Sequence, residues 1–142
     1  MSAIIRPSQV RNFYGRDQCI SIMKKIMVVD DEKDLLALVK GQLKKAGYEV
    51  AVTTSCKEGA DILTSFKPDL IFLDINVGSE DGREMCKQIK SLAEHKHIPI
   101  ILISANDDAL NTYKEYDADS FLKKPFQPVQ LLDVAARYLS PI

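Results

Sequence analysis

Short apolar runs alternate along the chain with longer segments whose apolar residues recur at helical spacing. Five apolar runs are expected to form strands, at 26–29, 48–52, 69–73, 98–104 and 120–122. Five amphipathic segments are expected to form helices, at 34–46, 56–66, 82–93, 107–116 and 128–139. Such repeated strand–helix alternation predicts the α/β class, with a parallel sheet covered by helices on both faces.

Length and composition fit one soluble globular domain. The chain has 142 residues, of which 46% are hydrophobic and 27% charged. A net charge of −1 argues against direct nucleic-acid binding, which usually needs a basic patch. No apolar run reaches the roughly 18 residues needed to cross a membrane. The 3 cysteines have no paired spacing, so we expect reduced thiols and a cytoplasmic location.

The beginning of the chain differs from the rest, because it has neither a helical nor an alternating apolar pattern. Arginines and a proline interrupt it, which is unlike a secretory signal. We therefore predict a disordered extension over residues 1–23, or an upstream start that the cell does not use. The folded domain is predicted over residues 24–140.

Polar residues lie where the predicted strands end. Asp30 and Asp31 follow the first strand, Asp74 the third, Ser104 closes the fourth, and Lys124 follows the fifth. In an open parallel sheet, ligands bind outside the carboxyl ends of the strands. Each residue alone has a simpler interpretation: the two aspartates suit an acidic first helical turn, and the lysine a solvated surface. Their joint position at four strand ends favours a site.

Carboxylates about 4 to 6 Å apart repel each other by roughly 3–4 kcal/mol at an effective dielectric near 20. Either one of them is protonated, or a cation lies among them. All-oxygen ligands suit Mg²⁺, which prefers one or two carboxylates, water and a phosphate. A carboxylate can also act as a nucleophile and form an aspartyl phosphate. Mg²⁺, an ammonium and a hydroxyl would neutralise the transferred oxygens.

Four motifs in this order resemble the receiver domain of two-component response regulators, over about residues 24–140. They are IMVVDDE (26–32), PDLIFLD (68–74) with Gly82 following, PIILISA (99–105) and DSFLKKPF (119–126). The resemblance implies a flavodoxin-like doubly wound (βα)₅ fold with strand order 2-1-3-4-5. It also implies a phosphoacceptor switch in a phosphorelay, with weak autophosphatase activity at most, and not an enzyme.

By this resemblance, Asp74 accepts a phosphoryl group from a phosphohistidine on a sensor histidine kinase or a histidine phosphotransfer protein. Asp31, Asp74 and the backbone carbonyl of Asn76 are expected to hold Mg²⁺, with Asp30 acting through metal-bound water. Lys124 is expected to stabilise the phosphoryl group, and its bond to the following proline is often cis in this family.

The resemblance also implies a conformational switch. Ser104 matches the hydroxyl that moves to the phosphoryl oxygens, and Phe121 the aromatic ring that then turns inward. Asn76 and Asn106 match the positions that tune phosphoryl lifetime. The surface of the fourth helix, fifth strand and fifth helix is expected to contact a downstream protein, or a second copy in a phosphorylation-dependent dimer.

Two positions depart from the family pattern. Gly78 replaces a common proline, which predicts a more mobile loop, and Asp117 replaces a turn glycine. Aspartate tolerates the left-handed backbone region better than most residues, so the turn is expected to survive.

Three other functions are compatible with parts of this sequence. A receiver-like interaction module that is never phosphorylated is the main alternative, although such modules usually lose an acidic residue or the lysine. A Mg²⁺ phosphohydrolase would typically carry its nucleophile on the first strand, with a general acid two residues later. Here the presumed nucleophile, Asp74, is on the third strand, and Asn76, two residues later, cannot donate as an acid. A dinucleotide-binding fold would need a glycine-rich loop after the first strand.

Overall fold

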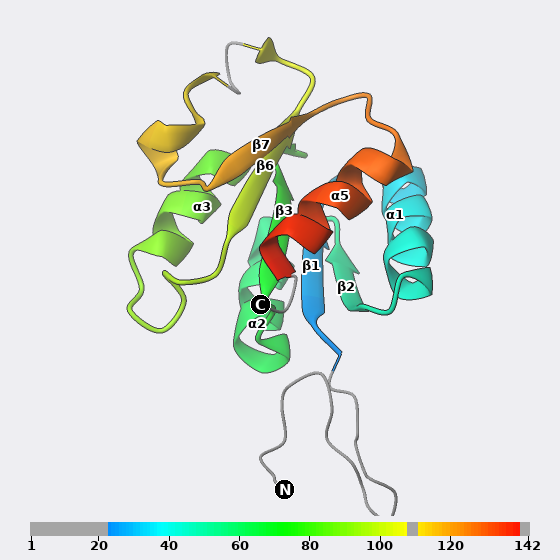
Figure 1. The fold of residues 1–142 in the computed structure, drawn as a ribbon. Helices are drawn as coiled ribbons and strands as arrows, with labels where there is room; N and C mark the ends of the chain where they lie inside the picture. The colour runs from blue at the N-terminus through cyan, green and yellow to red at the C-terminus, as the bar shows by residue number, and fades with distance from the viewer. Residues whose placement is uncertain (1–22, 108–110, 140–142) are drawn as a thin grey trace, which may run out of the picture.

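The computed structural model describes residues 23–107 and 111–139, which form a five-stranded parallel sheet with helices on both faces (Figure 1). The strand order is β2-β1-β3-β6-β7, which confirms the predicted doubly wound order because β4 and β5 form a separate hairpin. The sheet strands are β1 (Lys25–Val29), β2 (Glu49–Thr53), β3 (Leu70–Asp74), β6 (Ile100–Ser104) and β7 (Ser120–Lys123). The helices are α1 (Lys33–Lys45), α2 (Cys56–Phe66), α3 (Gly82–Lys90) and α5 (Pro128–Leu139), with a 3₁₀ helix η1 (Tyr113–Tyr116).

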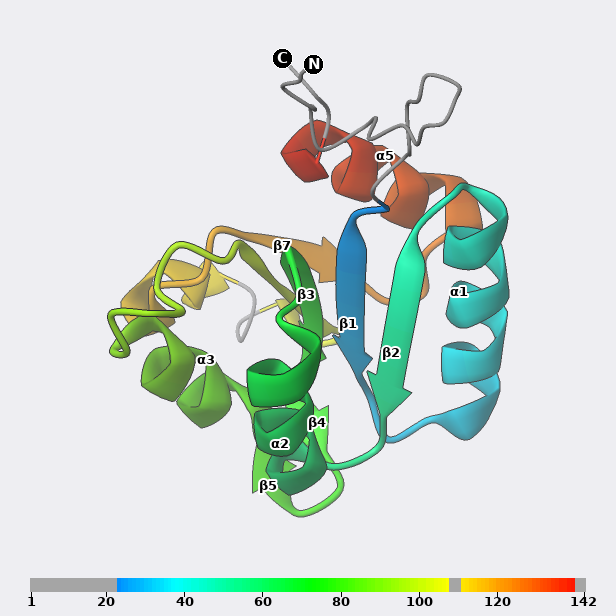
Figure 2. The same ribbon diagram turned by 90° about the horizontal axis from the view of Figure 1, so that it is seen from below.

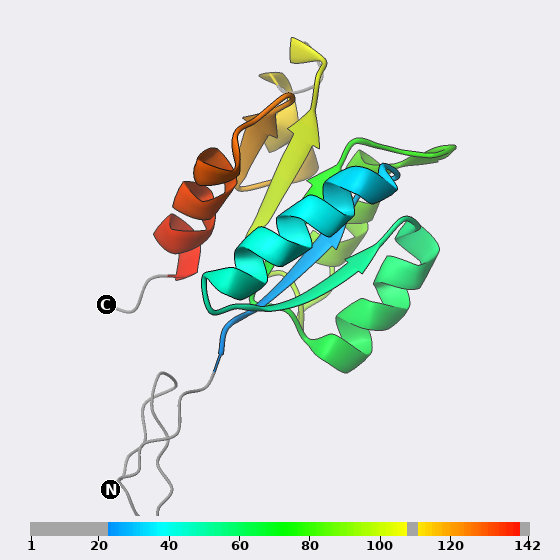
Figure 3. The same ribbon diagram turned by 90° about the vertical axis from the view of Figure 1, so that its right-hand side faces the viewer.

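The helices form two layers. Helices α1 and α5 cover one face of the sheet, and α2 and α3 cover the other, as the view from below shows (Figure 2). A side view shows α1 lying across β1 and β2, with α5 beside it (Figure 3). Because all five strands run in parallel, their carboxyl ends meet at one edge of the sheet. We call this the carboxyl edge, and the opposite one the amino edge.

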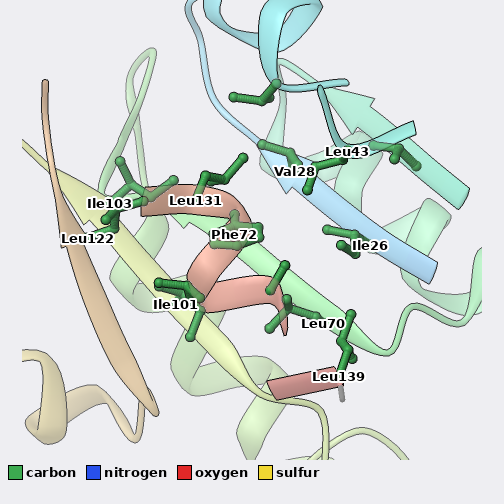
Figure 4. Packing of buried hydrophobic residues seen from close by; sticks show 14 of the residues in the cluster. Ile26, Val28, Leu43, Leu70, Phe72, Ile101, Ile103, Leu122, Leu131 and Leu139 are labelled. Carbon is green, nitrogen blue, oxygen red and sulfur yellow. The ribbon is translucent and has the colours of Figure 1, made fainter. Parts of the chain in front are cut away.

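Alternation along the buried strands divides the core in two. In β3, Phe72 packs toward α1 and α5 (Figure 4), whereas Leu73 packs toward α2 and α3. Every residue of β3 and β6 is buried, as expected for strands covered on both faces. Burial of this apolar area, at about 25 cal/mol per Å², is the main force holding the layers together.

Two expected helices differ from the structure. Helix α3 ends at Lys90 and not at residue 93, and Leu92 is 45% exposed, because the chain turns away after Ser91. A ten-residue helix over 107–116 was expected; the described part of this range contains η1, and residues 108–110 lie outside the described residues.

A short antiparallel hairpin, β4 (Asn76–Val77) and β5 (Glu80–Asp81), was not predicted. Two-residue strands are too short for their apolar alternation to be visible in the sequence. Gly78 occupies the turn with φ +62°, a left-handed conformation that glycine adopts at low cost.

An extension was predicted over residues 1–23, and residues 1–22 of it lie outside the described residues. Within residues 23–107 and 111–139, no helix has the length and apolar character to span a membrane.

Candidate functional site

Three carboxylates meet at the carboxyl edge. Asp74 is the last residue of β3 and Asp30 directly follows β1, the neighbouring strand, so parallel pairing brings the two together. Asp31 follows and is exposed, whereas Asp30 and Asp74 are 0% and 4% exposed. One ligand oxygen of each lies within 4.8 Å of the others. The expected acidic cluster is therefore present.

Lys124 joins this cluster from the loop after β7, and its side chain is only 17% exposed. Its Nζ lies 2.9 Å from Asp74 Oδ2 and 2.9 Å from Asp30 Oδ2. Burial works to lower the pKa of Lys124, but its hydrogen bonds to Asp74 and Asp30 outweigh this and raise the pKa. The ammonium is therefore firmly charged. The Lys124–Pro125 peptide bond is cis.

The neighbouring Lys123 takes no part in the cluster. Its Nζ points to the exposed Asp107 carboxylate, 2.8 Å away, because successive residues of a strand face opposite sides. Of the two neighbouring lysines, the structure therefore brings Lys124, and not Lys123, to the cluster.

The cluster carries more negative than positive charge. Burial, with help from the Asp74 charge, raises the pKa of Asp30 to about 6, although bonds from the Glu32 N–H and Lys124 oppose the rise. Asp30 Oδ2 is fully buried and faces the Lys124 ammonium at 2.9 Å. A buried oxygen of this kind, between two further carboxylates, fits a hard divalent cation such as Mg²⁺.

Gly82 is required by the way the hairpin returns to the end of β3. Its N–H donates to the Ile75 carbonyl at 2.7 Å, and a Cβ at this position would lie 1.9 Å from the backbone oxygen of Asp74. No side chain fits there. The glycine noted in the sequence motif therefore sets how closely the hairpin approaches Asp74.

The hairpin also helps to hold the cluster. The Asn76 N–H donates to Asp74 Oδ1 at 3.0 Å, and the Gly78 N–H donates to Asp31 Oδ2 at 3.2 Å. These bonds turn both carboxylates toward the same loop. The Asn76 side chain is exposed at the mouth of the site.

Ser104 ends β6 and is 2% exposed. Its Oγ accepts a hydrogen bond from the Asn106 N–H at 3.0 Å, so the hydroxyl is engaged with the loop that follows the strand. Movement of the Ser104 hydroxyl toward Asp74 would have to break this bond or carry the loop with it.

Phe121 lies on β7 and is 40% exposed. Its ring packs against Tyr113 of η1, with centroids 5.1 Å apart and an interplanar angle of 51°. Asp117, which ends η1, has φ +64°, so the aspartate at the glycine position does adopt the left-handed conformation. The turn before Phe121 is therefore retained without glycine.

Sequence reasoning missed one contact at the site. Glu32, the N-cap residue of α1, places Oε1 3.2 Å from Lys124 Nζ. The sequence feature that could have indicated this contact is the glutamate itself, because N-cap residues are usually Ser, Thr, Asn or Asp.

Comparison with known proteins shows the family of this chain. Residues 26–136 match the response regulator receiver domain family. The alkaline phosphatase synthesis transcriptional regulatory protein PhoP of Bacillus subtilis (strain 168) is 36% identical over 107 residues, which are 74% of this chain and 44% of PhoP. The chain thus spans less than half the length of this relative.

Two solved structures illustrate the similarity of the fold. The chemotaxis protein CheY4 of Vibrio cholerae has a TM-score of 0.77 and 28% identity, over 82% of this chain and 99% of CheY4. The receiver domain of NtrX from Brucella abortus has a TM-score of 0.75 and 30% identity, over 82% of this chain and 99% of that domain.

Proposed function

Because this chain belongs to the response regulator receiver domain family of two-component signalling, we propose that Asp74 is its phosphoacceptor. The observation that carries this proposal is the position of Asp74, which ends a buried strand with Lys124 Nζ 2.9 Å from its Oδ2. Asp30 and Asp31 lie beside it. The arrangement combines a nucleophilic oxygen with a fixed cation that can pair with incoming phosphoryl oxygens.

The donor in this proposal is a phosphohistidine on a sensor kinase or a histidine phosphotransfer protein. A carboxylate oxygen of Asp74 forms the new P–O bond while the P–N bond to the imidazole breaks, and the electron pair of that bond returns to the ring nitrogen. Lys124 pairs with a phosphoryl oxygen as the phosphoryl group passes to Asp74. The reaction is a single acceptance that leaves a modified protein, so the proposed role is a switch and not an enzyme.

Receiver domains bind Mg²⁺ at an acidic pocket, and the cluster here has suitable oxygens. Asp31, Asp74 and the Asn76 backbone carbonyl would hold the ion, with Asp30 acting through water. Bound Mg²⁺ would neutralise negative charge on the carboxylates and the phosphoryl oxygens.

The output in this proposal is a change of surface. Ser104 would leave the Asn106 N–H for a phosphoryl oxygen, and Phe121 would leave Tyr113 and turn inward. A downstream protein, or a second copy of the chain, would then recognise the surface of the 107–116 segment, β7 and α5. Asn76 and Asn106 are both exposed beside the cluster, where they would affect access of hydrolytic water.

Intact mass spectrometry after incubation with acetyl phosphate tests the proposal. We expect a Mg²⁺-dependent gain of one phosphoryl group that is lost in Asp74→Asn. Asp81→Asn, a matched change in the neighbouring hairpin, is expected to keep the gain. If the native chain binds Mg²⁺ yet gains no mass from this donor or a phosphorylated histidine protein, the unphosphorylated interaction module becomes the better description.

A further inference from the structure

Lys124 has a third carboxylate partner that the proposed chemistry does not use. Besides Asp30 and Asp74, its ammonium contacts Glu32 Oε1 at 3.2 Å, a residue 92 positions away in the sequence. The Glu32 side chain is 59% exposed, whereas those of Asp30 and Asp74 are 0% and 5% exposed. Glu32 therefore reaches Lys124 from the solvent side of the cluster.

The local structure of Glu32 supports a role beyond starting the helix. It is the N-cap residue of α1, yet its side chain makes no capping hydrogen bond. A Ser, Thr, Asn or Asp at this position would normally bond a free N–H of the first turn. The backbone N–H of Glu32 donates to Asp30 Oδ1 at 2.8 Å, which fixes the start of its side chain beside the cluster.

We propose that Glu32 is a positioning residue that holds the ammonium of Lys124 in competition with the phosphoryl group on Asp74. This inference rests on the proposed function, because it concerns the same lysine. An ammonium has three donors, and here three carboxylates occupy it. When Asp74 carries the phosphoryl group, Lys124 must turn from the former Asp74 carboxylate toward a phosphoryl oxygen, while Asp30 and Glu32 still hold it. Of these two contacts, the one to exposed Glu32 can be given up without leaving a buried carboxylate unpaired.

The competition should be modest. An ion pair with one exposed partner contributes little and is screened by salt. Removing it should therefore change affinity for a phosphoryl-like anion by about three- to fivefold, and not by orders of magnitude. In this way Glu32 adjusts the affinity of the site for the phosphoryl group without taking part in the transfer.

Three variants distinguish loss of the Glu32–Lys124 contact from loss of a negative charge near the site. Glu32→Gln removes the charge and keeps the length, and Glu32→Asp keeps the charge but is one methylene too short for the contact. Asp34→Asn is the matched control: it removes an acidic charge from the first turn of the same helix, and Asp34 has no contact with Lys124.

The primary measurement is the equilibrium affinity for beryllofluoride, a stable phosphoryl mimic, at saturating Mg²⁺, followed by NMR. The second is the initial rate of phosphorylation by acetyl phosphate. Glu32→Gln and Glu32→Asp should each tighten beryllofluoride binding about three- to fivefold, with Asp34→Asn close to the native chain. The difference should shrink at high salt.

Several outcomes would overturn the inference. Equal affinity in all four proteins would show that Glu32 does not compete. Tighter binding in Glu32→Gln and Asp34→Asn, but not in Glu32→Asp, would show a general charge effect. Weaker Mg²⁺ binding by Glu32→Gln, measured calorimetrically, would make Glu32 part of the cation site. Failure of the native chain itself to bind beryllofluoride would count against the proposed function and not against Glu32 alone.

Discussion

Each edge of the sheet holds a lysine that is mostly buried, but the two lysines meet different surroundings. At the amino edge, Lys90 Nζ, at the end of α3, lies 2.7 Å from Asp119 Oδ2 and also donates to the carbonyls of Ile98 and Lys96. One carboxylate and two carbonyls satisfy one ammonium. At the carboxyl edge, Lys124 faces Asp30, Asp74 and Glu32, with Asp31 nearby.

The difference lies in charge balance. The amino-edge carboxylate also accepts the Ile100 N–H at 2.8 Å, so the pair joins α3, β6 and β7 with one negative charge for one positive charge. The carboxyl edge has several negative charges for one lysine, and the pKa of Asp30 is raised there by burial. A balanced ion pair stabilises the fold, whereas an excess of carboxylates destabilises the folded state by repulsion until a cation binds.

The largest effect is expected from breaking the amino-edge pair with Lys90→Met. The change leaves the Asp119 carboxylate and two carbonyls without their cation, and because Asp119 is partly exposed the loss should be about 2 kcal/mol of unfolding free energy. Urea unfolding with and without Mg²⁺ measures it. The loss should be the same in both conditions. If Mg²⁺ restored the stability of Lys90→Met, the two edges would be energetically coupled.

A smaller effect of opposite sign is expected from Asp30→Asn without Mg²⁺. The folded-state pKa of about 6 lies above the ordinary 3.8, so protonation adds stability at low pH, and this contribution is lost as the pH rises through about 6. Near neutral pH the variant should therefore be more stable than the native chain, by about 1 to 2 kcal/mol.

Urea unfolding at about pH 4 and about pH 7.5 tests the sign, because the advantage should vanish at the lower pH. Saturating Mg²⁺ should reverse the ranking near neutral pH, since the native chain binds the ion better. The exposed Asp34→Asn change should show neither trend. A destabilised Asp30→Asn at neutral pH would contradict the assignment of excess charge to this edge.

The smallest effect is expected on β7, which runs from one edge to the other. Tyr113→Leu removes the ring that packs on Phe121, which should cost under about 1 kcal/mol of stability. NMR of the Phe121 ring should show averaging between outward and inward positions before any phosphorylation. Tyr138→Phe removes an exposed contact to the carbonyl of Asp119, the residue before β7, and should leave the Phe121 signals unchanged.

Much of this arrangement was available from the sequence. The apolar runs determined the strands of the main sheet, because a strand buried on both faces must be apolar throughout, as β3 and β6 are. The order of the motifs located Asp30, Asp31, Asp74, Ser104 and Lys124 at strand ends. Parallel topology then required these ends to lie at one edge.

Other features depended on tertiary contacts. The β4–β5 hairpin and the 3₁₀ turn η1 are too short to give a periodic signal, and both contact distant segments: the Gly78 N–H donates to Asp31, and Tyr113 packs on Phe121. The role of Gly82 is set by the Asp74 backbone beside it, and the unusual N-cap Glu32 by a lysine 92 residues away.

The sequence by itself therefore determined which chemical groups reach the carboxyl edge, since strand pattern and chain direction fix where each strand ends. Only the tertiary structure decided how those groups share their charges: which carboxylates are buried, and which contact of Lys124 stays exposed. Burial and distance control electrostatic energy, and both arise only when distant segments pack together.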